Sequence, residues 1–257
     1  MKMNYLFTLC ARAGSKGFKN KNLKEFCSKP VSFYSLAAVK LFADRHKDDN
    51  VTLALNTDSE ELKQLFKAQS FFGDIVFVDR KAEHADDKTA KVIVIQDTYN
   101  ECRHSCDYDL IIDLDITSPM RTVTDIENAV KAFESGENDL AFSVCNSRRN
   151  PYFNMVEKDS EGVCRRICRA SFTTRQQAPK TYDLNASIYV YSPKFLSSEI
   201  EKTILDYKFD VSIMEDYLVL DIDSEEDYNM MQHLYPFFCK SNPELNEIAD
   251  TVRQIEY

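Results

Sequence analysis

Residues 3–22 read MNYLFTLCARAGSKGFKNKN and join a short apolar run to a basic loop. The apolar run, residues 3–9, predicts a buried strand. In the loop that follows, Gly14 and Gly17 allow backbone amides to approach a phosphate chain closely, and nearby cations can neutralise that chain. Composition alone would favour a solvated basic loop, but the position directly after a strand indicates an anion site. The cations suited to phosphate are Arg12, Lys16 and Lys21.

Two common nucleotide-binding patterns are absent from this loop. It contains no Walker A spacing, and Gly14 and Gly17 do not form the dinucleotide-binding fingerprint. We therefore expect a nucleoside triphosphate held by a loop of different construction.

Short apolar runs alternate with helical patterns along the chain. Strands that alternate with long helices imply a mainly parallel sheet covered on both faces, and ligands bind such sheets at the carboxyl ends of the strands. An irregular stretch at about residues 146–181 predicts a lid or arm within a single domain, 1–257. Strands are expected at 3–9, 51–55, 75–78, 110–114, 140–145, 184–191 and 217–222, and helices at 31–42, 59–66, about 89–102, about 124–135, between 191 and 217, and from 224 to about 234.

Charge and cysteine content narrow the class of protein. The 257 residues carry 42 acidic and 32 basic side chains, a net charge of −10, which argues against nucleic acid or anionic membrane as a partner. The eight cysteines lack the dense spacing of a disulfide-stapled fold and indicate reduced thiols in a cytoplasmic protein. The pairs Cys102/Cys106, which flank His104, and Cys164/Cys168 could together form a zinc site, but structural zinc sites more usually use a tighter spacing, and the same four-residue spacing suits buried residues on one helix face.

A second constellation is Asp221-Ile222-Asp223, at the end of an expected strand. Alternation along a strand places both carboxylates on one side, where hard oxygen ligands can hold Mg²⁺ together with phosphate oxygens and water. The alternative is that Asp223 and Ser224 only cap the next helix. Because the basic loop is expected to bind a triphosphate, whose oxygens would share the metal, we favour the metal site.

Polar residues also follow other strands. The apolar strand at 110–114 is followed by polar residues that suit a binding edge: Asp115, Thr117, Ser118 and Arg121. The alternative is that Ser118-Pro119 forms a turn and Arg121 lies on the surface. Polar groups suited to a hydroxyl-rich acid occur in RQQAP at 175–179 and in NASIY at 185–189, where an ordinary loop and strand would look similar.

Taken together, these motifs resemble the acylneuraminate cytidylyltransferases, also called CMP-sialic acid synthetases. The family shows a basic R-x-x-S loop, a TSP-x-R segment, an RQ-x-x-P stretch, an N-x-x-I-Y strand and a late D-I-D, in the same order. The matching stretches here are 12–22, 117–121, 175–179, 185–189 and 221–223, so the resemblance spans almost the whole chain.

The resemblance implies a Rossmann-like α/β domain of the nucleotide-diphospho-sugar transferase type, with the arm exchanged between subunits of a homodimer. It implies that a nonulosonic acid attacks the α-phosphorus of CTP through its anomeric hydroxyl, that pyrophosphate leaves, and that Mg²⁺ assists. The implied catalytic residues are Arg12, Lys21, Asp221 and Asp223, of which the two aspartates hold Mg²⁺. The implied nucleotide-binding residues are Arg12, Ser15, Lys21, Asn22, Arg80 and Thr89, and those near the sugar are Arg175, Gln176, Asn185 and Tyr189.

One departure from the family concerns the sugar. Where the family commonly has Gln-Pro before TSP, this chain has Asp115-Ile116. An ionised aspartate only accepts hydrogen bonds, so we expect Asp115 to favour donors on the sugar, such as the two amides of N,N'-diacetyllegionaminic acid, over N-acetylneuraminic acid. The alternative is that Asp115 faces Mg²⁺ or an arginine and never meets the sugar.

Two other functions stay open on sequence grounds. The same fold would serve a nucleotidyltransferase that uses another nucleotide or a Kdo-type eight-carbon acid. A catalytically silent nucleotide-binding partner is the alternative from another class, and the presence of Lys21, Asp221 and Asp223 argues against it.

Overall fold

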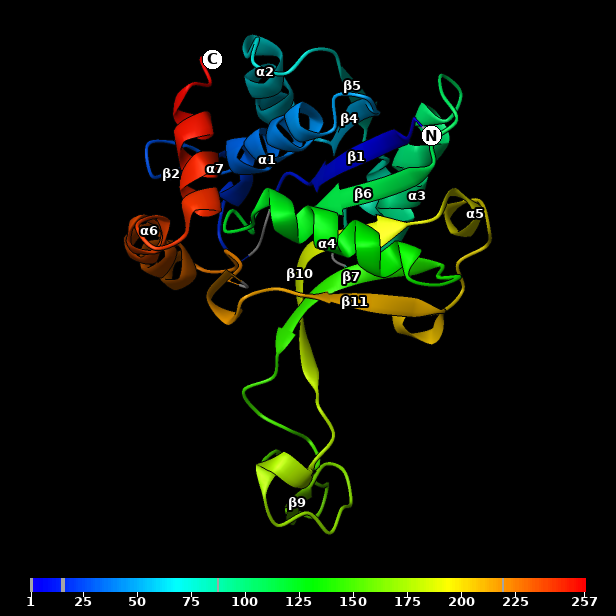
Figure 1. Cartoon of the computed structure of the whole chain (residues 1–257), viewed down its shortest axis with the longest axis vertical. Helices are drawn as coiled ribbons and strands as arrows, with labels where there is room; N and C mark the ends of the chain where they lie inside the picture. Colours follow the sequence, from blue (N-terminus) through cyan, green and yellow to red (C-terminus); the bar gives the residue numbers. More distant parts are fainter. Residues whose placement is uncertain (1, 15–16, 87, 219) are drawn as a thin grey trace.

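The computed structural model describes residues 2–14, 17–86, 88–218 and 220–257, and its central element is a seven-stranded sheet (Figure 1). The strand order is β11-β7-β10-β6-β1-β4-β5. All neighbouring pairs are parallel except those that β10 makes with β6 and β7, which confirms the predicted mainly parallel α/β fold. The strands are β1 (Asn4–Ala11), β4 (Asn50–Thr57), β5 (Ile75–Asp79), β6 (Leu110–Leu114), β7 (Leu140–Asn146), β10 (Tyr182–Tyr191) and β11 (Phe209–Ile213).

Helices cover both faces of this sheet, and the side chains of β1 show why. Tyr5, Phe7 and Leu9 belong to the hydrophobic core on one face, whereas Leu6 belongs to the core on the other, so the strand is buried on both sides. The first core contains residues of α1 (Ser32–Arg45), α2 (Glu60–Ala68), α4 (Val123–Glu134), α6 (Glu225–Cys239) and α7 (Pro243–Arg253), and the second contains residues of α3 (Lys91–Cys102) and α5 (Pro193–Leu196).

The irregular stretch predicted at about residues 146–181 forms an arm that projects from the sheet between β7 and β10 (Figure 1). It carries a short hairpin and one turn of 3-10 helix in place of long regular elements. These are β8 (Val156–Lys158), β9 (Cys164–Arg166) and η3 (Arg175–Gln177). Cys164 lies in β9 on the arm and Cys102 in α3. Among the described residues no group of three or more His, Cys, Asp or Glu could hold a metal ion, so the two cysteine pairs do not form one zinc site.

The prediction of a strand at 217–222 is wrong. The chain there forms a 3-10 turn, η5 (Asp216–Leu218), residues 220–222 belong to no strand, and the strand beside β7 is instead β11. Residue 219 lies outside the described residues. Leu218 and Ile222 are both buried in the first core, so the run is apolar because it packs there, although its backbone does not join the sheet. The helix predicted between 191 and 217 is reduced to α5 and a 3-10 turn, η4 (Ile204–Asp206).

A small hairpin anchors the end of the basic loop. After η1 (Lys21–Leu23), strands β2 (Glu25–Phe26) and β3 (Lys29–Pro30) are joined by a tight turn that lies against α6. The Cys27 thiol contacts the carbonyl oxygen of Gln232 at 3.9 Å, and Pro236, four residues later, has no N–H to offer that carbonyl. The loop is thereby tied to the helix that follows Asp223. In the part of the chain that the structure describes, no helix is long and apolar enough to span a membrane.

Arg121 is buried, although its sequence context suggested a binding edge or a surface position. Only 1% of the residue is exposed. Its guanidinium donates to Ser187 Oγ at 3.1 Å, to Ser35 Oγ at 2.8 Å and to the carbonyl oxygen of Asp115. Burial lowers the pKa of Arg121 to about 10, so it stays charged at neutral pH. The side chain therefore ties the end of β6 to α1 and β10.

We expect Arg121→Met to lower the free energy of unfolding by about 3 to 5 kcal/mol, because it removes a buried cation and leaves its partners unsatisfied. Urea-induced unfolding followed by circular dichroism measures this change. Arg253→Met is the control, since Arg253 pairs with Asp250 at the surface and its side chain is 63% exposed, so its loss should cost less than about 1 kcal/mol. Equal effects of the two substitutions would show that Arg121 does not have this structural role.

Candidate active site

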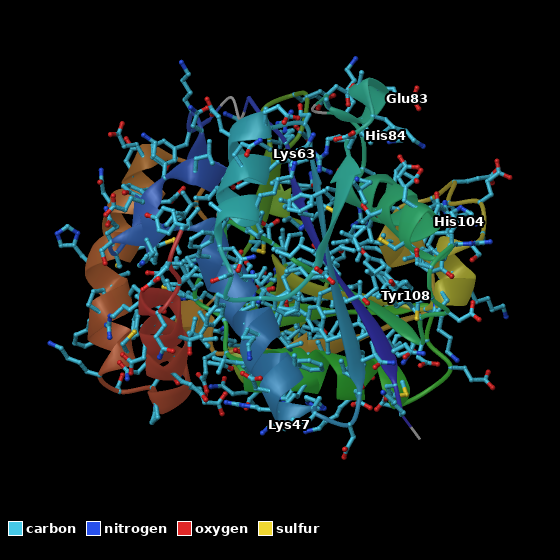
Figure 2. The ribbon with its side chains drawn as sticks, turned by 90° about the horizontal axis from the view of Figure 1, so that it is seen from above. Lys47, Lys63, Glu83, His84, His104 and Tyr108 are labelled. Carbon is cyan, nitrogen blue, oxygen red and sulfur yellow. The ribbon has the colours of Figure 1, made fainter. Side chains whose placement is uncertain are left out.

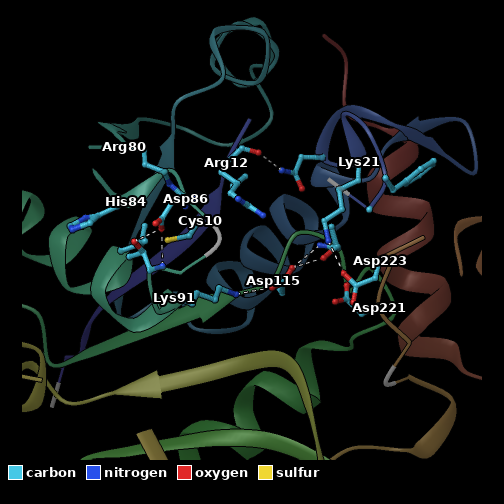
Figure 3. A pocket seen from close by; sticks show the side chains of 17 residues that line it. Cys10, Arg12, Lys21, Arg80, His84, Asp86, Lys91, Asp115, Asp221 and Asp223 are labelled. Atoms are coloured by element: carbon cyan, nitrogen blue, oxygen red, sulfur yellow. Dashed lines mark hydrogen bonds and ion pairs between the residues drawn. The ribbon is translucent and has the colours of Figure 1, made fainter. Parts of the chain in front are cut away.

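A cavity of about 540 Å³ lies at the carboxyl ends of β1 and β6 (Figure 3). Eight of the residues predicted to act at the site line it: Arg12, Lys21, Asn22, Arg80, Thr89, Asp115, Asp221 and Asp223. Ser15 lies outside the described residues. The parallel strands bring these positions together, since their carboxyl ends meet at one edge of the sheet.

The basic loop packs directly against the Asp221–Asp223 segment. Lys21 Nζ donates to the carbonyl oxygen of Ile222 at 3.0 Å and lies 3.0 Å from Asp223 Oδ1. A Cβ atom added to Gly17 would lie 2.7 Å from the carbonyl oxygen of Asp223, so only glycine fits there without a shift. Residues about 200 positions apart in the sequence thus form one wall.

The opposite wall holds the positions expected near the nucleotide. Arg80 Nε donates to Asn56 Oδ1 at 3.1 Å, and burial lowers the pKa of Arg80 without removing its charge. Thr89 donates from both its N–H and its hydroxyl to Asp86 Oδ1, at 2.9 and 2.8 Å. Arg80 and Thr89 are therefore held in place before any ligand binds.

His84 also lines the cavity, although no sequence pattern distinguishes it from the other three histidines. Its Nδ1 lies 2.5 Å from Asp97 Oδ2, and Asp97 also pairs with Lys81 at 2.8 Å. Figure 2 shows Glu83 and His84 at the rim of the molecule opposite Lys47. His84 comes from η2 (Ala82–His84), directly after β5, so strand topology places it near the site.

Asp221 and Asp223 differ in environment. The Asp223 side chain is 77% exposed, whereas Asp221 is half-buried. Burial raises the pKa of Asp221, and the negative charge of Asp115 raises it further, while Thr117 and Lys21 act in the opposite direction. Two carboxylates open to a cavity are the protein ligands that Mg²⁺ typically uses alongside substrate phosphates.

Asp115 is paired within the protein. Its Oδ1 accepts from the N–H and hydroxyl of Thr117, at 2.9 and 2.7 Å, and its Oδ2 lies 2.8 Å from Lys91 Nζ. Burial alone would raise the pKa of Asp115, but Lys91 and Thr117 outweigh it and hold that pKa well below its ordinary value. Asp115 is therefore an ionised acceptor at neutral pH, and its partner is a lysine rather than the arginine considered from sequence.

Lys91 is the functional candidate that sequence reasoning missed. Its ammonium pairs with Asp115 (Figure 3) and also with Asp113, whose Oδ2 lies 2.7 Å away. It sits 5.6 Å from the ring centroid of Tyr189. Since Lys91 is the first residue of α3, its positive charge lies at the end of the helix where the dipole disfavours cations. That unfavourable position was a signal available in the sequence.

The four residues carried over as sugar-binding do not line this cavity. Arg175 and Gln176 are exposed on the arm, and Arg175 donates to the carbonyl oxygen of Ser147 at 2.7 Å. Asn185 is 7% exposed and accepts from Ser143 Oγ at 2.6 Å. Tyr189 pairs with Asp113 across the sheet and lies beneath Lys91.

Comparison with known proteins gives one family. The model of a family described as Cytidylyltransferase matches residues 7–189. Two Campylobacter proteins are each 36% identical to the chain over 234 residues, covering 89% of it and 94% of the relative. They are "Post-translational flagellin modification protein B" of Campylobacter coli and "CMP-N,N'-diacetyllegionaminic acid synthase" of Campylobacter jejuni. An "N-acylneuraminate cytidylyltransferase" of Streptococcus agalactiae is 23% identical over 227 residues, 88% of this chain and 52% of the relative.

Solved structures support the fold. A CMP:2-keto-3-deoxy-manno-octonic acid synthetase complexed with CTP superposes with a TM-score of 0.63 at 14% identity, covering 93% of this chain and 100% of the other. A 4-diphosphocytidyl-2C-methyl-D-erythritol synthase from Anaerococcus prevotii gives a TM-score of 0.56 at 15% identity, with 91% and 98% coverage.

The contact between the basic loop and Asp223 should be sensitive to one methyl group. We expect Gly17→Ala to weaken binding of a nucleoside triphosphate by about ten- to a hundredfold, because an extra carbon forced into a packed contact costs about 1 to 3 kcal/mol. Isothermal titration calorimetry measures the affinity. Gly73→Ala is the matched control, since no atom lies within 4 Å of a Cβ at that position. Unchanged affinity in Gly17→Ala would mean that the loop does not need this close approach.

Proposed function

The chain belongs to the cytidylyltransferase family, and from this we propose that it joins CMP from CTP to the anomeric hydroxyl of a nonulosonic acid and releases pyrophosphate. The observation that carries the proposal is the contact of Lys21 with Ile222 and Asp223, which joins a phosphate-binding loop to a pair of carboxylates in one cavity. The relative named CMP-N,N'-diacetyllegionaminic acid synthase supports the choice of acid.

Catalysis in this reaction consists mainly of alignment and neutralisation of charge. We assign Arg12, Lys21 and Asn22 to the triphosphate, with Lys21 neutralising charge that moves onto the leaving pyrophosphate. Arg80 and Thr89, fixed by Asn56 and Asp86, are assigned to the cytidine. All these residues already line the one cavity.

The reaction is proposed to depend on Mg²⁺. Asp221 and Asp223 would hold it, because both carboxylates line the cavity beside the basic loop to which the phosphates are assigned. The bound ion would supply charge neutralisation at the phosphates. Among the described residues no cluster of three or more His, Cys, Asp or Glu is arranged as a metal site, so substrate and water oxygens would complete the coordination.

We propose N,N'-diacetyllegionaminic acid as the preferred acid. Asp115 is an ionised acceptor on the cavity wall, which suits a substrate group that donates a hydrogen bond. The name of the Campylobacter jejuni relative points to the same compound.

The arm is proposed to form a homodimer. It exposes a group of apolar side chains, which a second copy would cover: Met155, Val156, Val163 and Ile167. Exchange of the arms would also allow Arg175 and Gln176 to approach the cavity of the partner, which would account for their distance from the cavity of their own chain. A cytoplasmic location is proposed from the eight unpaired cysteines.

Pyrophosphate release from purified protein tests the proposed reaction. With Mg²⁺ present, we expect release with CTP and a nonulosonic acid, and a higher kcat/KM for N,N'-diacetyllegionaminic acid than for N-acetylneuraminic acid. ATP, GTP and UTP, and Kdo as acid, are the controls for the neighbouring activities. Release that is faster with one of these, or absent with every nonulosonic acid, would contradict the proposal.

We expect Asp221→Asn and Asp223→Asn each to reduce turnover by about a hundredfold or more, since loss of a metal ligand removes several kcal/mol of transition-state stabilisation. The Mg²⁺ concentration for half-maximal rate should rise in both variants. Asp216→Asn is the control, because Asp216 lies outside the cavity and pairs with Arg148 near the surface. Retained wild-type kinetics in both variants would refute the metal assignment.

A further inference from the structure

We propose that Lys91 and Asp115 together bind one hydroxyl group of a sugar ring or chain in the substrates. This inference rests on the proposed function and adds Lys91 to its specificity-determining residues. It starts from the bridge that the Lys91 ammonium makes between Asp113 Oδ2 at 2.7 Å and Asp115 Oδ2 at 2.8 Å.

Both members of the pair retain hydrogen-bonding capacity on the cavity side. An ammonium group has three donors, and the two carboxylates take two of those on Lys91. Asp115 Oδ1 already accepts twice from Thr117, whereas Oδ2 meets one donor, Lys91, and each carboxylate oxygen has two lone pairs. A donor and an acceptor therefore lie side by side on the wall.

The net charge around Lys91 and Asp115 favours a neutral ligand group over an anionic one. Lys91 faces two carboxylates, and even with Arg121 behind Asp115 the group has no net positive charge. A phosphate or carboxylate oxygen would gain little attraction here and would meet the repulsion of Asp115. A hydroxyl accepts from the ammonium and donates to the carboxylate at the same time, so it satisfies both groups.

The lysine is fixed before substrate binds. Asp113 is fully buried, its Oδ1 accepts from the Thr8 hydroxyl at 2.8 Å, and β1 and β10 flank it in the sheet. The ring of Tyr189 covers the ammonium on the sheet side. Because the Lys91 side chain is still 32% exposed, its remaining side faces the cavity. A pre-positioned pair binds its ligand without a further ordering cost.

Figure 3 places the pair between Arg80 and His84 on one side and Lys21, Asp221 and Asp223 on the other. A ligand that spans the cavity therefore passes over the Lys91–Asp115 pair. The hydroxyl is therefore either one on the ribose of CTP or one on the acid, and substrates that lack single hydroxyls distinguish these sources.

The test compares kcat/KM for CTP with 2′-deoxy-CTP and 3′-deoxy-CTP, and for the acid with its singly deoxygenated analogues. In the wild type we expect one deletion to lower kcat/KM by about ten- to a hundredfold, as for hydrogen bonds to charged groups. In Lys91→Gln and in Asp115→Asn the same deletion should cost less than about threefold. A purely structural lysine would lower kcat/KM for all analogues alike and leave the ratio unchanged.

Lys40→Gln and Asp44→Asn form the matched control, because this lysine–aspartate pair lies on the surface of α1, outside the cavity, and should keep the wild-type ratio. Asp115→Asn preserves shape at a side chain that is 23% exposed, so it carries the test if Lys91→Gln does not fold by circular dichroism. The inference is overturned if no deletion matters in the wild type, or if Asp115→Asn keeps full discrimination.

Failure of the proposed function would look different, since no pyrophosphate would form with any acid. Isothermal titration calorimetry then measures the affinities for CTP, for the acids and for their deoxy analogues. The ratio of affinities between each parent compound and its deoxy analogue replaces the ratio of kcat/KM. Equal affinity for every deoxy analogue and its parent would overturn the inference independently.

Discussion

The burial of charge at the carboxyl end of β6 governs how the surrounding elements pack. Buried charges must be paired and hydrogen-bonded, and here helices on both faces of the sheet supply the partners. On one face Arg121 reaches Ser35 of α1, and on the other face Lys91 of α3 reaches Asp113 and Asp115. The strand end is thereby held from both sides, and the same groups that stabilise it form the wall of the cavity.

A second consequence is that the cavity joins segments from the two ends of the chain. Lys21 contacts Ile222 and Asp223, and the Cys27 thiol contacts the carbonyl of Gln232 in α6, so the basic loop is docked on the C-terminal region twice. The site is complete only when the C-terminal region has packed against the sheet. Substitutions in the hairpin or in α6 should therefore affect the site without touching a ligand, since they move the loop relative to its carboxylates.

The sequence predicted most of the sheet because its parallel strands are buried on both faces and read as continuous apolar runs. Prediction failed at 217–222, where an equally apolar run packs Leu218 and Ile222 into the core as irregular chain. It also missed β11, an edge strand with alternating and partly exposed residues such as Phe209 and Ile213. An apolar run indicates that a segment is buried. Whether the segment also pairs as a strand depends on whether a neighbouring strand in the sheet is available to it.

For the site, local sequence patterns were enough to identify the residue types that are available: a basic glycine loop, two late aspartates and a polar end to β6. These are local patterns, and their spacing carries chemical meaning without the fold. The pairings of these residues follow from the packing of the folded chain, because Lys21 meets Asp223, and Lys91 bridges Asp113 and Asp115, through contacts between elements distant in sequence. The same packing decides that Arg121 is internal and that Arg175 and Gln176 lie away from the cavity of their own chain. Burial and pairing are properties of packed elements, and no single stretch of sequence contains them.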